Sequence, residues 1–290
     1  MFRVLVFVIL TLNFNAQAAE YIPVPIPEVE MECGQESQPL EWSYCIHKKR
    51  GSRSQDVLYY MHARNGNPTW WNDKDYHTGK LYEEWEQQKV DAPTVVSISF
   101  GKLWLLTENE FEFMGGRHNI FLDSIVPLVE SKLNQKIDRR LIAGISMGGL
   151  NTLIQSLKVK NFYQKAAAIC TPLAAVSPHD GFLNVAKYFF SSSTSLKRAL
   201  MLWKFSKEFY PTQEVWKAND PIAQSKSFKV NGAPDFYSTC GKKDDWGCMK
   251  GSELLVENLR AKGASVEWVP RPGGHCDIDY MSLARFLSSQ

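Results

Sequence analysis

The chain has 290 residues, of which 44% are hydrophobic and 22% are charged, a composition that excludes disordered, low-complexity and collagen-like proteins. Its 33 lysine and arginine residues nearly balance its 31 aspartate and glutamate residues, and no basic cluster is long enough to track phosphates, so no nucleic-acid partner is expected. The length allows one or two domains with a sizeable core.

Residues 1–18 are predicted to be a signal peptide. Arg3 provides a positive start, residues 4–12 are almost entirely apolar, and residues 16–18 have the small-x-small pattern of a cleavage site. A transmembrane anchor is the alternative, but polar residues interrupt the run well before the length of about 20 apolar residues that a span requires. We therefore expect cleavage after Ala18 or Ala19, a secreted or periplasmic protein, and no stable insertion in a membrane.

Six cysteines follow the predicted signal peptide, an even number that suits an oxidising compartment. They are Cys33, Cys45, Cys170, Cys240, Cys248 and Cys276. Up to three disulfides could form, and sequence alone does not choose the pairing, although Cys33 with Cys45 would make a local link. The sequence contains no C-x2-C pair, and the spacing from Cys240 to Cys248 is not one that zinc sites favour, so we expect neither a metal nor another cofactor.

The rest of the chain alternates between strand and helix patterns after an extended, proline-rich lead-in over residues 19–40. Strands are predicted over residues 56–61, 93–100, 140–143, 165–170, 235–240 and 265–269, and helices over residues 120–133, 149–157, 251–262 and 278–287. Strands separated by helices indicate βαβ units and a mostly parallel sheet. We interpret residues 41–290 as a single α/β domain, and residues 171–233, with an aromatic-rich helical stretch, as a cap inserted over the loop end of the sheet.

The sequence from Gly144 to Gly148 has the pattern G-x-S-x-G, directly after a short apolar strand and directly before a helix. That context is typical of a nucleophile elbow, a strained turn that exposes a serine at the edge of a sheet. The glycines are explained by crowding, because side chains at these two positions would collide with neighbouring backbone. Ser146 is therefore the candidate nucleophile, and the alternative is a glycine-rich turn with no chemistry.

A serine nucleophile needs a base and a carboxylate that orients the base. His275 follows the last predicted strand and is the candidate base, with a loop histidine that caps the final helix as the alternative. Asp244 and Asp245 follow the strand over 235–240. We favour Asp244 as the acid, with Asp245 and a simple solvated turn as the alternatives; the carboxylate that does not face His275 should point to water.

The oxyanion of a tetrahedral intermediate also needs hydrogen-bond donors. The backbone amide of Met147 is one candidate, since it begins a helix and lacks a partner there. The second should come from the loop after the strand over 56–61, from the amide of Ala63 or Arg64.

Four segments together resemble the putative esterase family of α/β-hydrolases: Leu58–Ala63, Arg140–Gly149, Cys240–Asp244 and Gly273–His275. This family includes esterase D (S-formylglutathione hydrolase), bacterial feruloyl esterases and mycolyltransferases of the antigen 85 type, and the similarity runs from about residue 41 to the end of the chain. The resemblance implies an α/β-hydrolase fold, a triad of Ser146, His275 and Asp244, and an oxyanion hole formed by the amides of Arg64 and Met147. In one departure, the chain has Ala63 where many relatives have glycine, which would strain the loop if that residue needs a positive φ.

Six tryptophans fall in predicted loops and in the cap, and could bind an aromatic acyl group or a sugar, although packing of the cap on the core is the alternative for each. They are Trp70, Trp71, Trp104, Trp203, Trp216 and Trp246. We single out Trp71 and Trp246 as substrate-binding candidates. The main hypothesis is a serine carboxylic ester hydrolase acting on a small-molecule or glycan ester. The alternatives are an acyltransferase that uses the same acyl-enzyme, and a non-catalytic binding protein on a degenerate hydrolase scaffold.

Overall fold

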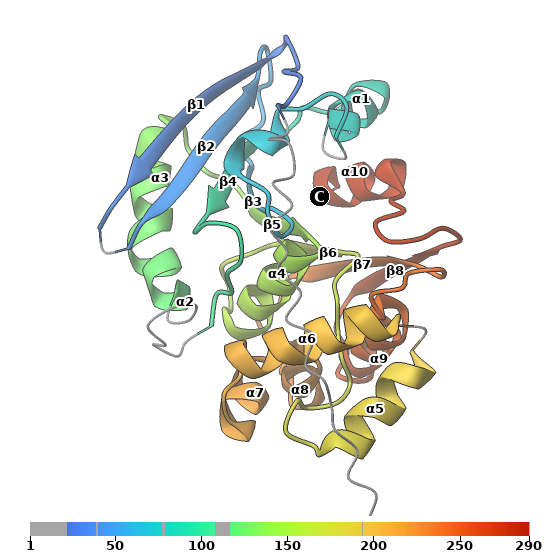
Figure 1. Cartoon of the computed structure of the whole chain (residues 1–290). Coiled ribbons are helices and arrows are strands. Elements are labelled where there is room, and N and C mark those ends of the chain that lie inside the picture. Colours follow the sequence, from blue (N-terminus) through green and yellow to red (C-terminus); the bar gives the residue numbers. More distant parts are fainter. Residues whose placement is uncertain (1–21, 39, 77–78, 108–116, 193, 290) are drawn as a thin grey trace, which may run out of the picture.

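A computed structural model describes residues 22–38, 40–76, 79–107, 117–192 and 194–289 (Figure 1). The predicted signal peptide, residues 1–18, and its cleavage site lie outside the described residues. Within the described ranges, no helix combines the length and the apolar character needed to cross a membrane.

The described residues form one mixed sheet in the order β1-β2-β4-β3-β5-β6-β7-β8. The strands are β1 (Val29–Glu36), β2 (Trp42–Lys49), β3 (Val57–Met61), β4 (Thr94–Ser99), β5 (Arg140–Ile145), β6 (Lys165–Ile169), β7 (Asp235–Gly241) and β8 (Val266–Arg271). Strands β3 to β8 pair in parallel, whereas β2 is antiparallel to both β1 and β4. The predicted mostly parallel α/β sheet is therefore confirmed.

The central strands are apolar along their whole length because both faces of the sheet are covered. In β3, Val57, Tyr59 and Met61 enter one core, while Leu58 and Tyr60 enter the core on the opposite face. Successive side chains of a strand point to opposite faces, which explains this division.

Helices cover both faces of the sheet (Figure 1). They are η1 (Pro68–Trp71), α1 (Gly79–Gln87), α2 (Arg117–Ile120), η2 (Phe121–Ile125), α3 (Val126–Lys132), α4 (Met147–Lys158), α5 (Phe182–Ser191), α6 (Leu196–Phe209), α7 (Gln213–Asn219), α8 (Pro221–Lys226), α9 (Cys248–Ala261) and α10 (Tyr280–Ser288). The η2, α3, α4, α8 and α9 helices contribute to one core, and α1 and α10 to the other. The predicted helix over residues 120–133 corresponds to α2, η2 and α3, of which η2 is a π-helical turn.

Helices α5 to α8 lie between β6 and β7 in the chain, within the predicted cap region (Figure 1). Val185, Tyr188 and Phe189 of α5 pack with Ala199 of α6 in a small apolar cluster of their own. Arg198 of α6 forms an ion pair with Asp245, so this insertion, residues 171–233 and here called the cap, contacts the loop that follows β7.

The N-terminal lead-in predicted over residues 19–40 is in part a strand of the sheet. Residues 29–36 form β1, the edge strand, which pairs with β2. A disulfide joins Cys33 to Cys45, the local link that the sequence allowed, at directly opposite positions of these two strands. The sheet therefore begins at Val29, before the domain boundary that we placed at residue 41.

Candidate active site

Ser146 occupies a strained turn between β5 and α4. Its φ of 55° and ψ of −112° are unusual for a residue with a side chain, and its amide donates to the Ile169 carbonyl at 2.8 Å. A Cβ on Gly144 would lie 2.2 Å from the Gly148 carbonyl oxygen, and one on Gly148 would lie 1.8 Å from the Met61 carbonyl oxygen. The G-x-S-x-G pattern is thus required by close backbone contacts, as predicted.

His275 and Asp244 are joined by a short hydrogen bond. His275 Nδ1 lies 2.6 Å from Asp244 Oδ2, and the Trp246 amide donates to Asp244 Oδ1 at 2.7 Å. Burial disfavours the ionised carboxylate, but the hydrogen bond and charge of His275 and the Trp246 amide outweigh it and hold the pKa of Asp244 below its usual value. Asp244 is therefore a buried, ionised partner for the imidazole.

The neighbouring carboxylate, Asp245, makes different contacts. It forms an ion pair with Arg198 of α6, and its carbonyl accepts from the Ser195 amide at 3.2 Å. We expected the second carboxylate to point to water; it is half exposed and also forms the ion pair with Arg198. Of the two, Asp244 contacts His275, and Asp245 links the loop between β7 and α9 to the cap.

The loop after β3 lies against the start of α4, because the missing side chain of Gly148 lets the carbonyls of Met61 and His62 approach it. The left-handed residue of this loop is Asn65, with φ of 63°, whereas Ala63 does not have a positive φ. Ala63 is therefore not strained. The positive φ of this loop falls on Asn65, and asparagine tolerates this conformation. The Arg64 side chain reaches the cap, where it lies 5.5 Å from the Phe205 ring centroid.

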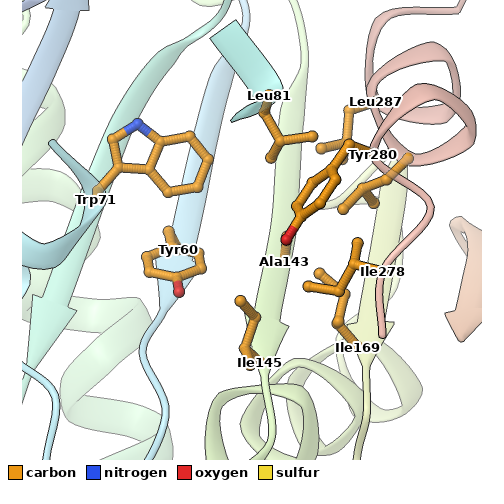
Figure 2. Close-up of a pocket in the computed structure, with 10 residues that line it drawn as sticks. Tyr60, Trp71, Leu81, Ala143, Ile145, Ile169, Ile278, Tyr280 and Leu287 are labelled. Atoms are coloured by element: carbon orange, nitrogen blue, oxygen red, sulfur yellow. The ribbon is translucent and has the colours of Figure 1, made fainter. Parts of the chain in front are cut away.

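The two tryptophans singled out from the sequence have different environments. Trp246 is partly exposed, and its ring centroid lies 5.6 Å from that of His275. Trp71 is only 1% exposed and donates from Nε1 to the Tyr82 hydroxyl at 2.7 Å. Figure 2 shows it beside an apolar internal pocket between the sheet and the α1 and α10 side. The substrate-binding role predicted for Trp71 is thus corrected, since its ring is enclosed in the core.

A second pocket lies between α4 and the cap. Its lining includes Leu150 of α4, Leu173 after β6, Phe189 of α5, Leu202 of α6 and Trp246. The pocket therefore extends from Trp246, which packs on His275, into the space beneath the cap helices. Most of its lining is apolar and could accept a hydrocarbon group, although Thr194, Ser206 and Asp220 also line it.

Sequence reasoning missed two connections at this site. Cys170, directly after β6, is bonded to Cys276, so a disulfide joins the end of the sheet to the residue next to His275. Arg198 of the cap also stacks on Trp246, with Cζ 4.6 Å from the ring centroid. The position of Cys276 beside His275 was a signal for the disulfide. Nothing in the sequence spacing indicated the contact between Arg198 and Trp246.

Two groups of side chains near His275 have the atom types of metal ligands. In one, Cys170 and Cys276 are already bonded to each other, so their sulfurs cannot act as thiolates. In the other, Cys240, Cys248 and Asp244 are buried and close together, with both thiols unbonded.

A family model described as "Putative esterase" matches residues 119–265, just over half of the chain. No curated protein sequence matches. Among solved structures, brefeldin A esterase, described as a bacterial homologue of human hormone sensitive lipase, has 16% identity and a TM-score of 0.64, over 93% of this chain and 78% of that one.

Two other solved structures are similar over nearly their whole length. The S-formylglutathione hydrolase of Agrobacterium tumefaciens has 15% identity and a TM-score of 0.60, over 90% of this chain and 92% of its own. The fluorophosphonate-binding serine hydrolase F of Staphylococcus aureus has 14% identity and a TM-score of 0.58, over 90% and 96%. At these identities the likeness shows a shared fold, that of the α/β-hydrolases.

Fold and family together define a carboxylic ester hydrolase. The chain belongs to the putative esterase family of α/β-hydrolases, as the motifs around Ser146, Asp244 and His275 implied.

Proposed function

We propose that the protein hydrolyses carboxylic esters through an acyl-enzyme on Ser146, with His275 as base and Asp244 as the acid that orients it. The observation that carries this proposal is the 2.6 Å hydrogen bond between His275 Nδ1 and a buried, ionised Asp244. Because Nδ1 bonds the carboxylate, Nε2 of the same ring can act as the base toward the serine, as in a catalytic triad. The strained backbone of Ser146 gives further support.

In the proposed first step, His275 Nε2 takes the proton of Ser146 Oγ while Oγ attacks the ester carbonyl carbon. Asp244 stabilises the imidazolium through Nδ1. The amides of Met147 and Arg64 donate to the carbonyl oxygen as it becomes an oxyanion. The C–O bond then breaks, and the alcohol leaves with the proton from His275.

In the second step, His275 takes a proton from water, and the resulting hydroxide attacks the acyl carbon. The acid is released, and Ser146 Oγ recovers its proton from the imidazolium. The acyl group is proposed to occupy the pocket between α4 and the cap, with Trp246 at its entrance. The mostly apolar lining and the contact of Trp246 with His275 support this position. The substrate class is a small-molecule or glycan ester.

We further propose export of the protein, with residues 1–18 as the signal peptide. Two disulfides in the described chain, Cys33–Cys45 and Cys170–Cys276, support an oxidising location. The continuous sheet from β1 to β8 supports a single catalytic domain in which residues 171–233 form the cap.

The proposal is tested with purified mature protein and a panel of aryl esters of increasing acyl length. Wild type should hydrolyse the esters, and Ser146→Ala should reduce kcat by at least about 10³-fold. Full activity in Ser146→Ala would refute the assignment of the nucleophile.

A further inference from the structure

Two unbonded thiols, Cys240 and Cys248, flank the loop that carries Asp244. Cys240 lies near the end of β7, and Cys248 is the first residue of α9. Residues 242–247, here called the acid loop, run between these elements. Both thiols are buried, whereas the other four cysteines of the chain are paired.

The two sulfurs are close to each other and to the acid. Cys240 Sγ, Cys248 Sγ and a carboxylate oxygen of Asp244 all lie within 4.8 Å of one another. Cys248 Sγ is also 3.8 Å from His275 Nδ1 and donates to the Cys170 carbonyl at 3.3 Å. A disulfide needs a sulfur–sulfur distance of about 2 Å, so the two side chains must move closer from their free-thiol positions when the bond forms.

We propose that Cys240 and Cys248 form a third disulfide in the exported protein, which closes the acid loop into a ring and clamps Asp244 in position. Its formation does not depend on the proposed function, but its consequence for catalysis rests on the proposed role of Asp244. In the reaction, each thiol loses one proton and one electron and a sulfur–sulfur bond forms. A low-molecular-weight disulfide such as oxidised glutathione takes up both protons and both electrons and leaves as two thiols.

The buried position of the pair indicates when the bond forms. Burial raises the pKa of the Cys248 thiol, which suppresses the reactive thiolate in the folded protein. The bond therefore forms during folding, before α9 packs over β7. Once formed, it removes conformations of the acid loop that would separate Asp244 from His275, since a covalent ring restricts the open states of the chain.

The sequence of the acid loop makes the bond easy to detect. Lys242 and Lys243 are exposed and lie between the two cysteines, so trypsin cleaves the backbone inside the ring. The peptides 230–242 and 244–250 then stay together only through a Cys240–Cys248 bond.

The first measurement uses wild-type protein exported through an oxidising compartment, unfolded and alkylated without reductant, digested with trypsin and analysed by mass spectrometry. We expect both cysteines to escape alkylation and the two peptides to appear as a linked pair that separates on reduction. Alkylation of Cys240 and Cys248, or a bond from either one to another cysteine, would overturn the proposal. This measurement requires no variant and no activity.

The second measurement tests the clamp by limited trypsin digestion of the folded protein. The double variant Cys240→Ala/Cys248→Ala removes this bond alone, with the other two disulfides as internal controls. We expect nicking at Lys242 or Lys243 to be at least about tenfold faster in the variant, because the open loop becomes accessible. Equal nicking rates in a wild type that carries the bond would show that the ring does not restrain the loop.

Discussion

Arg198 of the cap forms an ion pair with Asp245, the residue directly after the acid that contacts His275. The same guanidinium stacks on Trp246, which packs on the imidazole. Helix α6 is therefore connected to the loop that holds Asp244 through Asp245 and Trp246.

The Arg198 contact predicts a modest effect on catalysis. Arg198→Gln should lower kcat/KM measurably but by less than about tenfold, because a partly exposed ion pair contributes only about 1 kcal/mol or less. Arg285→Gln is the matched control, since it breaks an exposed ion pair with Glu267 that involves no cap residue. Steady-state kinetics on one aryl ester would contradict this account if the two variants behaved alike.

Asp244 and Asp245 should differ sharply when each is changed to asparagine. Asp244→Asn removes the charge that stabilises the imidazolium and should reduce kcat by about 10³-fold or more. Asp245→Asn leaves that hydrogen bond intact and should cost less than about tenfold. The comparison uses kcat for one ester and circular dichroism as a check on folding. Equal losses would show that Asp244 has no special role.

Gly148 is predicted to tolerate no side chain. A methyl group there would overlap the Met61 carbonyl, so Gly148→Ala should destabilise the protein by about 3 kcal/mol or more and abolish activity. Gly274→Ala is the control, because its Cβ would meet no atom within 4 Å. Urea denaturation measures both variants, and a wild-type midpoint for Gly148→Ala would show that the close contact is not needed.

Asp220 predicts a pH dependence of stability. Burial raises the pKa of this carboxyl to about 7. Hydrogen bonds from the amides of Ala223 and Ile222 lower the pKa, but by less than burial raises it. A raised folded-state pKa means that the folded protein binds the proton more tightly than the unfolded chain. The resulting stability is complete below the usual pKa of 3.8 and is lost as the pH rises through about 7.

The matched variant is Asp220→Asn, which keeps an N-cap for α8 and removes the titration. Between pH 5 and pH 8, wild type should lose about 2 kcal/mol of unfolding free energy relative to the variant. Urea unfolding of both proteins at the two pH values measures this difference. Parallel pH profiles would mean that Asp220 does not titrate in this range.

The sequence predicted the centre of the sheet well because its strands are buried on both faces. Residues 57–61 and 141–145 are apolar runs bounded by polar residues, and short runs of this kind are typical of buried strands. In contrast, β1 was predicted as a lead-in. Most of its side chains are exposed, and its charged residues give no apolar run, so only its pairing with β2 identifies it as a strand.

The candidate site could also be predicted only in part from the sequence. The G-x-S-x-G turn is visible in sequence because close backbone contacts demand its glycines. The choice between Asp244 and Asp245 depends on the direction of each side chain, which adjacent identical residues do not reveal. Trp71 and Trp246 both occur in polar surroundings in the sequence, yet only tertiary packing puts one in the core and the other on His275.

The central claim, that Ser146 is activated by His275, is tested most directly by labelling the purified mature protein with a fluorophosphonate probe. Wild type should be labelled covalently, and labelling should be lost in Ser146→Ala and strongly reduced in His275→Ala, since the serine alone is a weak nucleophile. Circular dichroism of the three proteins confirms that each is folded. Unchanged labelling of Ser146→Ala, or no labelling of folded wild type, would contradict the account.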